Sequence, residues 1–201
     1  MQEGTPIKID HLGAKNCVTG SCHLMQIPVD LVRAVNILVD CGKAQGKDPE
    51  LPFDAFPAAP GEIDYLFLTH AHIDHIGRVP DLIDAGFEGE IICTHGTKAL
   101  LGPMLHDSLS FTQKSKREIQ AIEQRIDQFS WGFEYGEVFF SKKVFSSNWV
   151  MLAISLGPVL SGLKFLWNTK KMPIGFFFRE ILAAQIPRFC LILIFPMPVI
   201  C

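Results

Sequence analysis

The feature that most constrains this chain is an apolar segment that ends in a dense group of metal-ligating side chains. Residues 63–69 are nearly continuous in apolar residues, which is typical of a strand buried on both faces. The six residues that follow contain three histidines and one aspartate: His70, His72, Asp74 and His75. Apolar residues then recur at helical spacing over residues 76–85, before Gly86. This order predicts an α/β layer structure with a polar cluster at the carboxyl end of a strand.

The rest of the first part of the chain predicts further strands and helices around this segment. Short apolar segments separated by turn-forming residues predict strands at residues 7–12, 22–27, 35–39 and 90–93. Helical spacing predicts helices at residues 97–105 and 113–129. With 48% apolar residues in a chain of 201, there is ample material for a core, and a wholly disordered chain is excluded.

The spacing within the cluster favours metal binding. Because side chains alternate along an extended segment, His70 and His72 point to the same side and can reach one cation at about 2.0–2.1 Å. Asp74 and His75 lie where the chain turns into the helix and can face a second cation. Two metals about 3.5–4 Å apart would share a water and clamp both oxygens of an in-line displacement at phosphorus. The alternative is a cluster of surface histidines that binds nothing.

The string His-Ala-His-Ile-Asp-His at residues 70–75 resembles the HxHxDH signature of the metallo-β-lactamase superfamily. Other segments resemble the β-CASP branch of that superfamily, which consists of RNA-processing nucleases. These segments are residues 11–14, 18–22, 39–42, 92–94, 100–101, 107–108 and 135–138. The resemblance covers about residues 7–138. It implies that residues 1–143 hold the N-terminal half of a metallo-β-lactamase-like αββα sandwich.

The resemblance also implies a cofactor, zinc, with two ions in the intact family. His70 and His72 would bind one ion, and Asp74 and His75 the other. Asp74 would also help to position the attacking water.

The resemblance implies a further role for Asp40, which would orient the metal loop from outside the ligand shell. The alternative for Asp40 is an Asx residue that caps the turn ahead of Gly42, and the two roles can coexist. The remaining histidines are interpreted as surface or packing residues: His11, His23, His95 and His106. Cys41 and Cys93 lie at strand ends, and the other four cysteines show no paired spacing, which favours structural thiols over a nucleophile.

The activity that the resemblance implies is cleavage of RNA phosphodiesters by metal-activated hydroxide, with RNA as partner. A net charge of -3 argues against binding nucleic acid by bulk charge, and nothing points to DNA. The basic run at residues 114–117 also has acidic neighbours, which favours a solvated helix face. The alternatives are a small-molecule thioester or lactone hydrolase of the same superfamily, and a non-enzymatic fragment or membrane-associated protein. With no leader at its start, we expect a cytoplasmic protein; the oligomeric state is open.

The character of the chain changes near residue 143. Residues 1–143 contain all seven histidines and carry a net charge of -7, whereas residues 144–201 carry +4 and contain a single acid, Glu180. The further histidine and the bridging aspartate that the β-CASP branch supplies later in its sequence are absent. The chain therefore lacks ligands that a dinuclear hydrolase needs, and the resemblance implies an incomplete, inactive site.

Codon degeneracy permits the missing motifs in another reading frame. When the last base of each codon is joined to the first two of the next, residues 150–160 permit Asp-Ala-Gly-His-Ile-Leu-Gly-Pro-Ser-Ala, and residues 177–185 permit Phe-Ser-Gly-Asp-Leu-Gly-Arg-Pro. These strings supply the histidine and the aspartate in family order. We hypothesise a frameshift between Val138 and Trp149, which makes residues 144–201 an apolar, out-of-frame tail. Its apolar stretches are too short or too interrupted for the roughly 20 residues of a membrane span.

Overall fold

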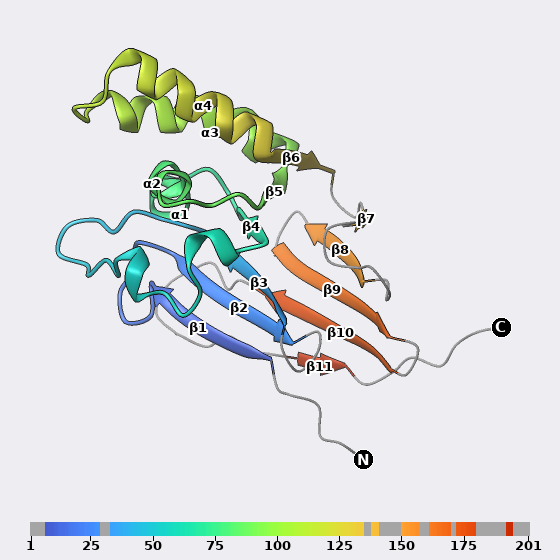
Figure 1. Ribbon diagram of the computed structural model, residues 1–201. Coiled ribbons are helices and arrows are strands. Elements are labelled where there is room, and N and C mark those ends of the chain that lie inside the picture. The colour runs from blue at the N-terminus through green and yellow to red at the C-terminus, as the bar shows by residue number, and fades with distance from the viewer. Residues whose placement is uncertain are drawn as a thin grey trace. The chain divides into compact units, whose positions relative to one another are not determined.

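The computed structural model describes residues 7–28 and 33–134 in full, and beyond them the backbone of five strands. The chain divides into two compact units, Met1–Phe133 and Glu134–Cys201. Figure 1 shows helices and strands together in the first unit and strands in the second. The mixed α/β fold predicted from the sequence is confirmed.

The first unit contains a six-stranded sheet in the order β1-β2-β3-β4-β5-β6. Its strands are β1 (Lys8–Gly13), β2 (Cys22–Pro28), β3 (Ala34–Val39), β4 (Tyr65–Phe67), β5 (Glu90–Thr94) and β6 (Ser130–Phe133). β1, β2 and β3 pair antiparallel, whereas β3, β4, β5 and β6 run parallel. β4 is shorter than the predicted strand at residues 63–69, and just beyond its carboxyl end the Thr69 amide donates to the Asp40 side chain. β6 was not predicted.

The helices of this unit are α1 (Ile73–Ile76), α2 (Val79–Asp84), α3 (His95–Ser110) and α4 (Lys116–Phe129), with 3-10 turns η1 (Phe53–Ala55) and η2 (Pro60–Glu62). The helix predicted at residues 76–85 is confirmed in part: α2 covers Val79–Asp84, whereas Ile76 is the last residue of the separate helix α1. Pro80 explains the break, since it has no amide hydrogen to continue the first helix. α4 begins at Lys116, later than predicted, because Ser115 and Glu118 form a capping box.

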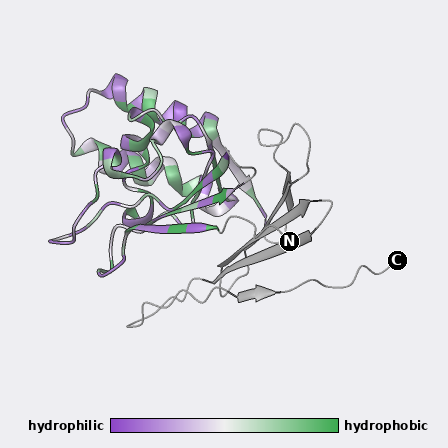
Figure 2. Ribbon diagram, turned by 60° about the horizontal axis from the view of Figure 1, so that its bottom comes forward, coloured by the Kyte–Doolittle hydropathy of each residue, from purple (hydrophilic) through white to green (hydrophobic). Residues whose placement is uncertain are grey.

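The strand order places the helices on one face of the sheet. β3 to β6 follow one another in space as in sequence, so right-handed crossovers carry every connecting segment over the same face (Figure 1). The core between sheet and helices includes Leu38, Leu66 and Ile91 from the strands, and Ile76 and Leu105 from the helices. Figure 2 shows both hydrophilic and hydrophobic residues on these helices, and the buried residues of α4, Ile119, Ile122 and Ile126, recur at the spacing of one helix face.

The second unit contains a five-stranded antiparallel sheet in the order β11-β10-β9-β8-β7. Its strands are β7 (Val138–Phe140), β8 (Val150–Leu156), β9 (Ser161–Thr169), β10 (Met172–Arg179) and β11 (Ile192–Ile194). No strands were predicted from the sequence in residues 144–201. Much of the predicted frameshift position, residues 141–149, lies outside the described residues, and the frameshift stays a hypothesis. Among the described residues, no helix is long and apolar enough to cross a membrane.

Candidate metal centre

The predicted metal cluster lies where β3 and β4 end and β2 begins. Asp40 directly follows β3, and Ser21 directly precedes β2. Because β3 and β4 are parallel neighbours, their carboxyl ends meet at one edge of the sheet. The Asp40 amide donates to the Phe67 carbonyl at 2.8 Å, which ties the two strand ends together. This edge brings residues far apart in the sequence around the residues 70–75 that carry the cluster.

Backbone hydrogen bonds hold α1 against the turn that follows β3. They are Ser21 N to Asp74 O (2.8 Å), Cys41 N to His75 O (2.8 Å), Lys43 N to Ile73 O (3.0 Å) and Arg78 N to Cys41 O (2.9 Å). Gly42 lies directly against this loop, because a Cβ added to it would be 1.6 Å from the Asp74 carbonyl oxygen. Only glycine allows this approach. The loop is therefore positioned by main-chain contacts from two other segments.

His70 and His72 turn ring nitrogens toward one another. The Nε2 atom of His70 lies 3.0 Å from the Nδ1 atom of His72, and His70 is half-buried whereas His72 is exposed. Two nitrogens bound to one zinc at the usual length in a tetrahedral arrangement are about 3.3 Å apart. The first predicted ligand pair therefore has donor types and a spacing that fit one zinc ion.

Asp74 and His75 form a second pair beside the first. The Oδ2 atom of Asp74 lies 3.7 Å from the Nε2 atom of His75. The rings of His70 and His75 have their centroids 3.9 Å apart, so the two pairs are neighbours. The other ring nitrogen of His75, Nδ1, lies 2.7 Å from Asp40 Oδ2, which leaves Nε2 on the side of Asp74.

The structure places the predicted ligands in two pairs. Within residues 7–28 and 33–134, no group of three or more His, Cys, Asp or Glu side chains is arranged to hold a metal ion. A catalytic zinc usually has three protein ligands. Each pair thus suits a zinc ion in donor chemistry, and each needs at least one ligand from elsewhere.

Asp40 is the hub of the hydrogen bonds around the site. Its buried carboxylate accepts from the Thr69 amide (2.9 Å), the Thr69 hydroxyl (3.0 Å), the Ser21 hydroxyl (3.1 Å) and His75 Nδ1 (2.7 Å). Its φ of 58° is left-handed, which is uncommon for a residue other than glycine and recurs at functional sites. The alternative role for Asp40 was to cap the turn ahead of Gly42. The Gly42 amide donates to the Ser21 carbonyl at 2.8 Å, so Asp40 does not cap that amide.

Thr69 extends this hub to His70. The Thr69 hydroxyl donates to Asp40, so its oxygen accepts from His70 Nδ1, 3.0 Å away. His70 then presents a bare Nε2 atom to His72. Partial burial, together with the neighbouring His75, lowers the pKa of His70. A lowered pKa favours the neutral imidazole, which is the form that binds metals.

Sequence reasoning missed Ser21, Thr69 and His23 as members of this network. His23 is 7% exposed and faces His11 across the β1–β2 pair, so the two form a pair fixed by strand register. Burial, and then the neighbouring His11, lowers the pKa of His23 to about 4. The available signal was the alternation of β1 and β2, which places these two histidines opposite each other once the turn between them is known.

The three buried cysteines of this unit behave as structural thiols. Cys22, Cys41 and Cys93 are buried and unpaired by disulfides. Burial raises the pKa of Cys93 to about 12, and burial raises the pKa of Cys41 well above its usual value. Buried thiols with raised pKa values are poor nucleophiles.

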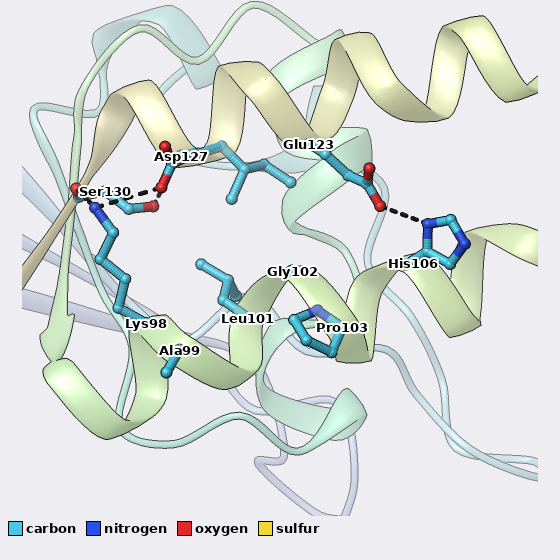
Figure 3. Close-up of a pocket in the computed structure, with 10 residues that line it drawn as sticks. Lys98, Ala99, Leu101, Gly102, Pro103, His106, Glu123, Asp127 and Ser130 are labelled. Atoms are coloured by element: carbon cyan, nitrogen blue, oxygen red, sulfur yellow. Dashed lines mark hydrogen bonds and ion pairs between the residues drawn. The ribbon is translucent and has the colours of Figure 1, made fainter.

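A hollow of about 450 Å³ lies between α3 and α4, away from the metal cluster (Figure 3). Its polar side chains pair with one another or with the backbone. Lys98 Nζ donates to the Ser130 carbonyl at 2.7 Å, and His106 Nδ1 lies 2.7 Å from Glu123 Oε1. Outside the hollow, Lys114 of the basic run pairs with Asp84 of α2 at 2.9 Å. These contacts are those of a solvated surface between two packed helices.

Comparison with known proteins places the chain among RNA-processing relatives. It is 34% identical to Ribonuclease TTHA0252 of Thermus thermophilus over 131 residues, which are 65% of this chain and 29% of that protein. It is 32% identical to Transcription termination factor FttA of Methanocaldococcus jannaschii over 122 residues, 60% of this chain and 18% of that protein. It is 34% identical to Cleavage and polyadenylation specificity factor subunit 3-I of Arabidopsis thaliana over 131 residues, 63% and 18% respectively.

The chain spans less than a third of the length of these relatives. They confirm the resemblance to the β-CASP branch over about 60% of the chain. The profile of the metallo-beta-lactamase superfamily matches residues 29–141, which are more than half of the sequence. The chain therefore belongs to the metallo-β-lactamase superfamily.

Proposed function

We propose that this chain carries part of the zinc site of a hydrolase that cleaves RNA phosphodiesters. The observation that carries the proposal is the two neighbouring donor pairs at the end of β4, His70 with His72 and Asp74 with His75, and the Asp40 carboxylate on the Nδ1 side of His75. The names of the relatives, a ribonuclease and a cleavage factor among them, support RNA as the substrate class. Membership in the superfamily implies metal binding.

In this proposal each side chain has a separate task. His70 and His72 hold one ion, and Asp74 and His75 hold the other. Zinc, when bound, lowers the pKa of a coordinated water and neutralises charge that develops at phosphorus. Asp74 also orients the attacking water. Asp40 keeps the proton of His75 on Nδ1, so that Nε2 stays available as a ligand.

The incomplete ligand sets limit what the chain does alone. Each pair supplies two ligands, and the described residues add no third side chain to either. We therefore propose that the 201-residue chain binds zinc weakly and that cleavage of RNA needs ligands beyond those described.

Zinc titration of matched histidine variants tests the metal proposal. We expect His75→Gln to lower zinc affinity at least about tenfold, because it removes a direct ligand. His106→Gln is the control: His106 is exposed, pairs with Glu123 on the α3–α4 surface and should leave zinc affinity unchanged. Competition against a chromophoric chelator measures both. Equal affinities in the two variants, or no zinc in the unmodified chain, would overturn the proposal.

A further inference from the structure

A row of hydrogen-bonded side chains leads from the metal hub into the β1–β2 hairpin. The Ser21 hydroxyl, which donates to Asp40 at 3.1 Å, lies 3.4 Å from His23 Nε2. His23 Nδ1 in turn lies 3.0 Å from His11 Nδ1. Ser21 and His23 are buried, at 6% and 7% exposed, whereas His11 is half-buried. The row thus joins the carboxylate beside His75 to the outer part of the hairpin.

Counting protons assigns the donor and the acceptor of each hydrogen bond in this row. The Asp40 carboxylate only accepts, so the Ser21 hydroxyl donates to it and offers its own lone pair to His23. His23 must then carry its proton on Nε2 to donate to Ser21. A neutral imidazole has a single N–H, so Nδ1 of His23 is bare and accepts from His11 Nδ1–H.

The surroundings of His23 keep it neutral. It is buried between β1 and β3, and the ionisable groups that act on it are His11 from β1, Asp40 after β3, and His75 from α1. A second proton on His23 would have to sit on Nδ1, directly opposite the Nδ1–H of His11. Burial and this opposition both disfavour the charged ring.

We propose that His23 is a positioning residue for the metal loop: its Nε2–H orients the Ser21 hydroxyl toward Asp40, and His11 selects the tautomer that makes this possible. Asp40 then fixes the ring of His75. The inference rests on the proposed function for its metal readout, but the tautomers themselves are a property of the metal-free chain. The roles predicted from the sequence for Asp40, Asp74 and the histidine ligands do not include His11 or His23.

Two amide substitutions separate the two ring nitrogens of His23. Glutamine carries its NH₂ group as many bonds from Cα as Nε2 of histidine, whereas asparagine carries it at the position of Nδ1. His23→Gln therefore keeps a donor for Ser21, and His23→Asn moves the donor to the side of His11. Both variants place a polar amide in the same buried position, so the general cost of burying an amide is the same in both.

The experiment uses the full 201-residue chain and two measurements. Nitrogen-15 NMR of the histidine side chains, without metal, should show His23 protonated on Nε2, and His11 and His75 protonated on Nδ1. His23→Asn should change the ring-nitrogen shifts of His75 and weaken zinc binding about tenfold. His23→Gln should restore the His75 shifts and keep zinc affinity within about threefold of the unmodified chain.

The outcomes separate this inference from the proposed function. If the unmodified chain binds no zinc, yet only His23→Asn changes the His75 shifts, the positioning role stands and the metal proposal fails. If His23 is protonated on Nδ1 in the unmodified chain, the inference is wrong. Identical His75 shifts in the asparagine and glutamine variants would also overturn it, whatever the zinc affinity.

Discussion

At the scale of single residues, the site depends on a close main-chain approach at Gly42. A Cβ there would lie 1.6 Å from the Asp74 carbonyl oxygen, with main-chain atoms and not a movable side chain in the way. We expect Gly42→Ala to lower the free energy of unfolding by about 3 kcal/mol or more, because the α1 loop must shift. Urea denaturation measures the change.

Gly102 provides the matched control. It lies in α3, and no heavy atom comes within 4 Å of a Cβ added to it. Gly102→Ala should therefore raise the free energy of unfolding by about 0.4–1 kcal/mol, since alanine restricts the unfolded chain and favours the helix. A similar loss in both variants would show that the effect at residue 42 is not steric.

His23 gives the fold a dependence on pH with a definite sign. Its pKa falls from an ordinary 6.5 to about 4 on folding, so the unfolded chain binds the proton more tightly. The stability that depends on neutral His23 is present above pH 6.5, is lost as pH falls below that value, and stops changing below about pH 4. The loss amounts to about 3 kcal/mol.

Denaturation of the unmodified chain and of His23→Gln between pH 7.5 and 4 tests this dependence, since carboxylates titrate alike in both. As pH falls across that range, the difference in free energy of unfolding between the unmodified chain and His23→Gln should shrink by about 3 kcal/mol. A constant difference would contradict the buried, neutral state of His23.

Residue spacing predicted the metal cluster, but it did not predict the network behind it. In an extended segment, the side chains of two histidines separated by one residue point to the same side. His70 and His72 were therefore predicted to be a pair. His11 and His23 meet only through strand register, which depends on the turn between β1 and β2. The tautomers then follow from Asp40, whose partners come from three separate segments.

At the scale of elements, the predicted and observed starts of two helices differ, one at a helix cap and one at a proline. α4 begins where the Ser115 side chain accepts from the Glu118 amide and Glu118 accepts from the Ser115 amide. The helix was predicted from residue 113, three residues before α4 begins, because the cap at Ser115 was not taken into account. The helix predicted at residues 76–85 likewise began three residues before α2, because the prediction did not take account of Pro80 in its first turn.

The capping box of α4 gives a prediction at this scale. Ser115→Ala should lower the free energy of unfolding by about 1 kcal/mol, because the Glu118 amide loses its partner. Ser115→Asp, which keeps an acceptor at the cap, should lose a few tenths of a kcal/mol or nothing. Thermal or urea denaturation distinguishes them, and a loss as large for aspartate as for alanine would contradict the capping role.

At the scale of the whole molecule, the missing ligands and the apolar C-terminal part belong to one hypothesis. If the coding DNA carries the codons that the sequence permits, a chain with the alternative frame restored after the region 138–149 contains the histidine and aspartate motifs of the β-CASP resemblance. We expect the restored protein to bind zinc at near two ions per chain and to cleave RNA, because both ligand pairs would be completed.

Side-by-side purification of the two versions tests this expectation through zinc content and cleavage of RNA. Cleavage of thioesters but not of RNA by the restored protein would favour a small-molecule hydrolase of the same superfamily. Equal RNA cleavage by the chain as printed would show that the absent ligands are not needed. Sequencing the coding DNA tests the frameshift itself, since codons incompatible with both motif strings exclude it.

The main-chain bonds that tie α1 to the turn after β3 have a consequence for how a metal would arrive. Ser21, Cys41 and Lys43 hold the carbonyls of residues 73–75 through amides that involve no ligand side chain. The loop is thus ordered by folding, and capture of an ion restricts little beyond the rotamers of a few rings. Preorganisation of this kind makes the conformational entropy of binding small, so loss and recapture of metal should leave the fold intact.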